Sequence, residues 1–122
     1  MKFIHPYEKA DVFELDGETT LIALKTKELR GRENVFLEEI MANNTKKAMI
    51  VDLSSLTFID SGSIGLLISM ERKAAAEGRY VGVCKAQGTV MNVLRMVGAA
   101  SIFPAYNWGI DEAHQEYKAK NQ

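Results

Sequence analysis

The stretch Met49–Gly65 reads MIVDLSSLTFIDSGSIG and decides how the chain is interpreted. An apolar run ends in a short polar turn, a second apolar pair follows, and a helical pattern begins after Asp60-Ser61-Gly62-Ser63. This order predicts a strand, a turn and the first turn of a helix. It places a serine hydroxyl at a helix N-terminus, where free backbone N–H groups and the helix dipole favour negative charge.

Short strand-like and helix-like segments alternate along the rest of the chain, which predicts an α/β fold with helices packed on a sheet. Strands are predicted at Val12–Leu15 and Leu21–Leu24, joined by an Asp16-Gly17-Glu18 turn, and at Ala48–Leu53, Tyr80–Cys84 and Ile102–Phe103. Helical spacing of apolar residues occurs in Phe36–Met41, Ser61–Gly78, Val90–Val97 and Ile110–Tyr117. Gly78 and Gly98 are expected to end the second and third of these helices.

The composition is ordinary for one globular domain. The chain has 122 residues, of which 47% are hydrophobic and 25% charged. Because 15 lysines and arginines nearly balance 16 acids, no large field favours nucleic acid or an anionic membrane. No apolar run approaches the ~20 residues that span a bilayer, and Pro6 interrupts a charged N-terminus that does not resemble a signal peptide. The expected location is therefore the cytoplasm.

Ser61 has two interpretations at this stage. As a phosphoacceptor it would gain nearly two negative charges, which the helix N-terminus would partly stabilise and the neighbouring Asp60 would oppose. A docking partner would then meet a charge that is costly to bury unpaired. As a purely structural element, Asp60-Ser61 would simply begin a helix, since both residue types are common N-caps. The physical chemistry alone leaves both interpretations open.

The same residues resemble the STAS domain of anti-sigma-factor antagonists. Ile50–Leu53 followed by Leu56–Ser61 is similar to the central strand, spacer and phosphorylation loop of that family. Leu94–Gly98 with Ile102–Phe103 resembles its later helix, glycine and final strand, and Leu24–Leu29 lies where it has an early strand. The resemblance spans roughly residues 12–117 and implies a single STAS domain over residues 1–122. It implies an α/β fold with a mixed sheet of about 4–6 strands and about four α-helices.

The resemblance also implies a function. In this family the serine directly after the aspartate is phosphorylated by a partner kinase, which here would be Ser61, with Ser63 as the alternative. The implied partner-binding loop consists of Asp60, Ser61, Gly62, Ser63 and Gly65. Asp60 would orient the acceptor hydroxyl, and the two glycines would let the partner backbone approach closely.

By this resemblance the protein is not an enzyme but an anti-sigma factor antagonist. Its unphosphorylated form would bind an anti-sigma factor that is also a serine kinase, and so release a sigma factor. Phosphorylation would end the interaction and a serine phosphatase would restore it. No cofactor and no metal are implied for this chain, since both belong to the kinase and phosphatase. The alternative is a non-switching STAS scaffold, or a soluble subunit of a signalling or lipid-transport complex, with Ser61 only a helix cap.

Three departures from the family pattern affect the partner. The common loop reads Asp-Ser-Ser/Thr-Gly-Leu-Gly, whereas the glycine and the second serine are exchanged here, at Gly62 and Ser63. Arg30 replaces an acid, and an arginine near the loop could pair with phosphoserine or suit a different kinase. Lys27 replaces the usual glycine of the preceding turn.

Other candidate sites carry little support. A hydrolase would need a histidine base, but His5 is expected in a loose N-terminus and His114 on an apolar helical stripe. One cysteine, Cys84, and two distant histidines offer no zinc spacing, and Cys84 is expected to be a small buried hydrophobe. Methionine and aromatic residues near the C-terminus could form a partner-binding patch but fit a core better. These are Met91, Met96, Phe103, Tyr106 and Trp108.

Overall fold

The computed structural model describes residues 1–120, with the backbone alone at residues 32 and 33. In chain order the elements are β1 (Lys2–Pro6), β2 (Ala10–Glu14), β3 (Thr19–Leu24), β4 (Glu28–Leu29), η1 (Gly31–Asn34), α1 (Val35–Ala42), β5 (Ala48–Asp52), β6 (Phe58–Ile59), α2 (Ser61–Ala76), β7 (Tyr80–Cys84), α3 (Gly88–Met96), η2 (Ala99–Ser101) and α4 (Ile110–Lys120). Here η marks a short 3₁₀ helix. None of the helices within this described part is both long enough and apolar enough to cross a bilayer.

The main sheet has the strand order β1-β2-β3-β5-β7. Strands β2 and β3 form the antiparallel hairpin expected from the sequence, and the Asp16 side chain accepts a hydrogen bond from the Glu18 N–H at 2.8 Å within its turn. Strands β3, β5 and β7 run parallel, so α1 and α2 serve as crossovers between them. Strand β5 is an inner strand, paired with β3 on one side and β7 on the other, and is buried along its whole length, which confirms the prediction from its continuous apolar run.

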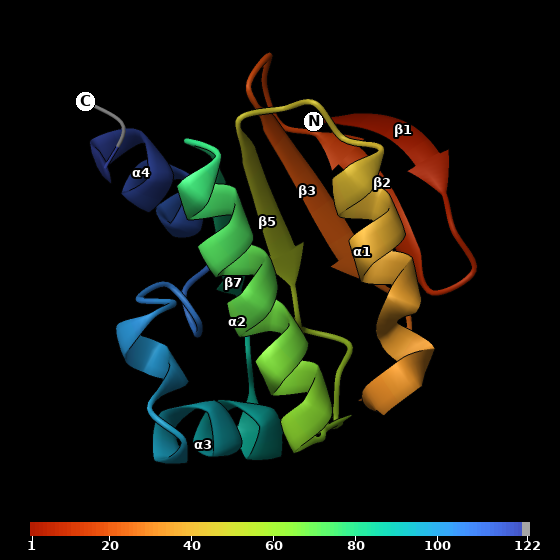
Figure 1. The fold of residues 1–122 in the computed structure, drawn as a ribbon, viewed down its shortest axis with the longest axis vertical. Helices are drawn as coiled ribbons and strands as arrows, with labels where there is room; N and C mark the ends of the chain where they lie inside the picture. Colours follow the sequence, from red (N-terminus) through yellow and green to blue (C-terminus); the bar gives the residue numbers. More distant parts are fainter. Residues whose placement is uncertain (121–122) are drawn as a thin grey trace.

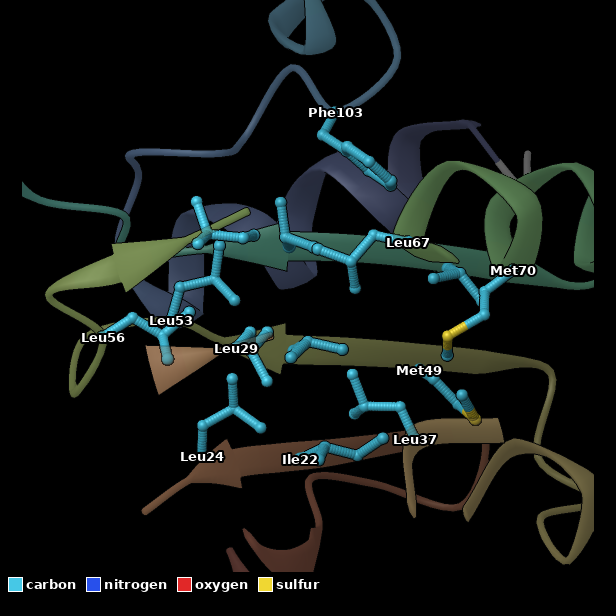
Figure 2. Close-up of a cluster of buried hydrophobic side chains, with 14 of the residues drawn as sticks. Ile22, Leu24, Leu29, Leu37, Met49, Leu53, Leu56, Leu67, Met70 and Phe103 are labelled. Carbon is cyan, nitrogen blue, oxygen red and sulfur yellow. The ribbon is translucent and has the colours of Figure 1, made fainter. Parts of the chain in front are cut away.

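Helices cover both faces of this sheet. Helices α1 and α2 lie side by side over one face, and α4 lies over the other (Figure 1). The larger core fills the space beneath α1 and α2, where Leu37, Leu67 and Met70 of the helices meet Met49 of β5 (Figure 2). The smaller core lies under α4 and includes Leu21, Ile50, Cys84, Ala105 and Ala113. Cys84 is thus the buried residue that the sequence predicts.

Two predicted features are wrong. Ile102–Phe103 is not a strand, because the chain turns after η2 and the Phe103 N–H donates to the Ala99 carbonyl at 2.9 Å. Phe103 instead inserts its ring into the larger core, where only 2% of it is exposed, and Pro104 could not have extended a ladder. The N-terminus around His5 is not loose either, since β1 pairs antiparallel with β2 as an exposed edge strand that ends at Pro6.

Helix ends and helix faces follow the sequence pattern with two exceptions. Gly78 and Gly98 adopt the left-handed conformation, with φ of 72° and 78°, one residue beyond the C-caps of α2 and α3. Val97, expected on the buried face of α3, is 57% exposed because it lies beyond the last helical residue. Met96 is 84% exposed and Trp108, in the loop before α4, is 42% exposed, so neither belongs to the core that was favoured for them.

A second, two-stranded sheet carries the residues around Ser61. Strands β4 and β6 pair parallel, with Glu28 opposite Phe58 and Leu29 opposite Ile59. The chain then enters α2 at the lower end of the molecule as drawn in Figure 1, whereas the N-terminus and the last turn of α4 lie at the upper end. The start of α2 and both described ends of the chain are therefore at opposite ends of the fold.

Candidate functional site

Asp60 is the N-cap of α2. Its backbone is extended, its Oδ1 atom accepts the Ser63 N–H at 2.8 Å, and the same oxygen accepts the Ser63 hydroxyl at 2.6 Å. The Ile64 N–H donates to the Asp60 carbonyl at 3.1 Å and begins the regular helix. An aspartate at this position satisfies N–H groups that have no partner inside the helix. The cap is therefore Asp60, and the hydroxyl that it orients is that of Ser63, whereas the resemblance implied that of Ser61.

Asp60 also joins two segments that are distant in sequence. Its two carboxylate oxygens accept the Gly31 N–H at 2.9 and 3.1 Å, which fastens η1 to the start of α2. Hydrogen bonds from the Ser63 side chain, the Ser63 N–H and the Gly31 N–H hold the pKa of the Asp60 carboxyl below its ordinary value. The nearby charge of Arg30 acts in the same direction. Asp60 is therefore a fixed negative charge at neutral pH.

Ser61 is the first residue of α2 and is exposed. Gly62 and Gly65 are exposed beside it on the first turns of the helix. A Cβ atom built on Gly65 would meet nothing within 4 Å, and one on Gly62 would be in ordinary contact with the Gly31 Cα at 3.6 Å. The fold itself therefore leaves room for a side chain at both positions. Because these two positions carry no side chain, the surface next to Ser61 is flat and exposes the backbone there.

Ser63 has the opposite environment, with only 1% of the residue exposed. Its hydroxyl donates to Asp60 and accepts a hydrogen bond from Nδ2 of Asn34, which is equally buried. The Asn34 Oδ1 atom has no hydrogen-bond partner among the described residues. Sequence reasoning missed Asn34, which lies 29 residues before Ser63. The exchanged glycine and serine were the available signal, because a hydroxyl on a buried helix position needs a polar partner.

Arg30 lies next to the loop at the end of β4. Its Nε and Nη2 atoms donate to the Glu28 carboxylate at 2.8 and 3.4 Å, and both side chains are 50% exposed. The guanidinium carbon lies 4.2 Å from the centre of the Phe58 ring, a cation–π contact. The residue that departs from the family pattern is thus a cation that contacts Glu28 and Phe58 and lies near enough to Asp60 to contribute to the lowering of its pKa.

Residues 12–104 match the family model described as "Mlab, STAS domain". The chain belongs to the STAS domain family. The structure confirms the α/β fold that the sequence predicts. Residues 1–120 contain four α-helices, a mixed five-stranded sheet and a small two-stranded sheet. No protein of curated function matches its sequence.

Solved structures resemble this STAS domain along most of its length. An anti-sigma factor antagonist from Mycobacterium paratuberculosis is 20% identical with a TM-score of 0.72, over 88% of this chain and 91% of that chain. The anti-sigma factor antagonist SpoIIAA in its unphosphorylated form is 19% identical with a TM-score of 0.67, over 90% and 96%. The phosphorylated form of the Bacillus protein SpoIIAA is 18% identical with a TM-score of 0.62, over 88% and 98%.

A transport protein contains a similar fold. The murine anion transporter Slc26a9 is 15% identical with a TM-score of 0.67, and the likeness covers 88% of this STAS domain but only 19% of the transporter chain. At such identities the likeness to solved structures concerns the fold alone.

The remaining candidate residues of the STAS domain lie elsewhere. His114 on α4 contacts Asp16 Oδ2 at 2.8 Å and Thr19 Oγ1 at 3.2 Å, so it holds α4 to the β2–β3 hairpin. His5 is on β1 and stacks edge-on against Tyr7. The Ser63 hydroxyl contacts the carboxylate of Asp60 and the amide of Asn34. Neither group is the imidazole base that a serine hydrolase uses. Within the described residues no group of three histidines, cysteines or acids could hold a metal ion.

Proposed function

We propose that this STAS domain is a phosphorylation-controlled binding module that acts as an anti-sigma factor antagonist, with Ser61 as the phosphoacceptor. The observation that carries the proposal is the contrast between the two serines of the loop. Ser61 is exposed on the first turn of α2, whereas the Ser63 hydroxyl is buried and engaged by Asp60 and Asn34. A kinase could reach Ser61 without disturbing the fold, but could reach Ser63 only by breaking the N-cap.

The same geometry explains how a phosphate would act as a switch. The dipole of α2 and the N–H groups of its first turn would partly stabilise a phosphate on Ser61, so the fold would persist. Asp60 already supplies one fixed negative charge there. A partner docked over the flat backbone at Gly62 and Gly65 would have to desolvate the phosphate, which is costly unless it is paired. Binding would therefore end without a conformational change.

The proposed partners are an anti-sigma factor that is also a serine kinase, and a serine phosphatase that removes the phosphate. The module itself needs no catalysis, cofactor or metal, and it would work in the cytoplasm. The similarity of the fold to SpoIIAA, which is described in both phosphorylated and unphosphorylated forms, supports this assignment.

The proposal is tested by intact mass and site mapping of the protein purified from its native cells. Phosphate on Ser61 is the expected result, and its absence under both growth and stress would refute the switch. Ser61→Asp should fold normally but lose the kinase partner in affinity purification, whereas Ser61→Ala should retain the partner and carry no phosphate. Phosphate found on Ser63 alone would refute the choice of acceptor.

A second candidate function is a non-switching STAS scaffold or a soluble subunit of a signalling or lipid-transport complex. It is favoured by the exchange that places Gly62 before Ser63, because the resulting cap is complete without any role for Ser61. The match to the family model described as "Mlab, STAS domain" supports it as well. Affinity purification distinguishes the two functions, since a subunit would retain its partners equally well in the Ser61→Asp variant.

A further inference from the structure

The backbone of Arg30 is held beside that of Asp60 by hydrogen bonds of its two chain neighbours. The Asp60 N–H donates to the carbonyl of Leu29, and the Asp60 carboxylate accepts the N–H of Gly31. Arg30 is the residue between these two, so its backbone runs next to that of Asp60 at about the 4.8 Å spacing of paired strands. Ser61 follows one residue further, about 3.8 Å along the chain.

Two contacts of Arg30 are of a kind that can be exchanged. The Arg30–Glu28 ion pair has both side chains half exposed, and such pairs contribute little to stability because water and salt screen them. The guanidinium also rests on Phe58, which is itself partly exposed. A phosphate dianion offers a guanidinium more charge than a carboxylate does, and it accepts two parallel hydrogen bonds. Competition between the two anions would therefore favour the phosphate.

We propose that Arg30 binds the phosphoryl group on phosphorylated Ser61, and that Glu28 is released from its ion pair when this happens. The inference rests on the proposed function and adds an internal phosphate-binding residue to it. The exchange has two effects on the surface that a partner meets. The phosphate becomes ordered against Arg30, and the carboxylate of Glu28, the first residue of β4, loses its ion pair. The surface therefore still gains the nearly two negative charges of the phosphate, of which part is now on Glu28.

Among the described side chains, the charges near the phosphate act in opposite directions. Arg30 and the N-terminus of α2 favour the dianion, whereas Asp60 and Glu28 favour the monoanion. The second pKa of a phosphoserine is about 6, so its value reports the balance directly. An arginine in contact with the phosphate must lower this pKa, and its removal must raise it.

The experiment uses the full chain with phosphoserine installed at position 61 by genetic-code expansion, so that no kinase is required. The pKa of the phosphate is measured by ³¹P NMR titration in the otherwise wild-type chain, in Arg30→Gln and in Arg72→Gln. Arg72 is a matched control because it is exposed on the same helix, about 16 Å from Ser61 at 1.5 Å per residue. Thermal melting verifies that each variant is folded.

The expected result is a phosphate pKa that is higher in Arg30→Gln than in the wild-type chain by about half a pH unit or more, with Arg72→Gln equal to wild type. Arg30→Lys should restore part of the difference, and Glu28→Gln should lower the pKa. Equal values in the wild-type chain and in Arg30→Gln would overturn the proposal. Because the phosphoserine is installed directly, this outcome is independent of whether cells phosphorylate Ser61, which is what decides the proposed function.

Discussion

Replacing Ser63 by alanine tests whether the buried network at the start of α2 stabilises the fold. The change removes the hydroxyl that accepts the Asn34 amide and donates to Asp60. Asp60 is solvated and keeps the Ser63 N–H, so most of the cost falls on Asn34. Only 1% of Asn34 is exposed. Its Oδ1 atom already has no hydrogen-bond partner among the described residues, and its Nδ2 atom would lose the hydrogen bond to Ser63.

The magnitude follows from these two effects. Leaving one buried donor unpaired costs about 1–3 kcal/mol, and alanine returns about 0.5 kcal/mol because it forms helices better than serine. The net loss in free energy of unfolding is therefore about 0.5–2.5 kcal/mol, or a fall of roughly 2–10 °C in Tm for a chain of this size. Ser61→Ala is the matched control and should stay within about 0.5 kcal/mol of wild type, since Ser61 is exposed.

The assay is urea denaturation followed by circular dichroism, with Asn34→Ala and the double variant included. Removing both partners leaves no unpaired amide, so the double variant should be more stable than the sum of the single effects by about 1 kcal/mol. Ser63→Ala with wild-type stability, or two single effects that simply add, would refute the idea that this network is energetically coupled.

Four further predictions concern other parts of the fold. The pKa of Asp60 is lowered by its hydrogen bonds, so its stabilising effect is complete above the unfolded pKa of about 3.9 and is lost as the pH falls through the lower folded value. Asp60→Asn should therefore flatten the loss of stability in acid, as measured by urea unfolding at several pH values, and an unchanged slope would contradict this. Gly65→Ala should raise the free energy of unfolding by about 0.5–1 kcal/mol, because the new methyl group meets nothing within 4 Å, and lower stability would indicate a clash. Phe103→Ala should lower the free energy of unfolding by about 3–5 kcal/mol and Met96→Ala by less than about 0.5 kcal/mol, and similar losses for the two would contradict the burial of Phe103. Burial raises the pKa of the Cys84 thiol to about 12, so a thiol reagent should label it only after denaturation.

The sequence predicts most of the fold because burial leaves a periodic pattern. The apolar run of β5, the Asp-Gly turn of the hairpin and the glycines after α2 and α3 all lie where they were expected. The missed elements lack such a pattern. All five residues of β1 are exposed, so its pairing with β2 leaves no alternation of apolar and polar residues. Ile102–Phe103 resembles a strand because two adjacent apolar residues before a proline give the same local pattern in a buried turn as in a sheet.

The candidate site was predictable only in part. The position of Ser61 at the start of a helix followed from local sequence, and so did an aspartate able to cap it. The division of roles between Ser61 and Ser63 did not, because it depends on Asn34 and Gly31, which are brought to the loop by the pairing of β4 with β6. Tertiary contacts of this kind leave no trace within a short window of sequence.

The placement of the two chain ends has a consequence for how this fold can be combined with others. Both described ends lie opposite the start of α2 (Figure 1), so a tether or a fused domain at either end would leave Ser61 and its surroundings uncovered. A fold with this property can be inserted into a longer polypeptide and still present the same surface to a partner.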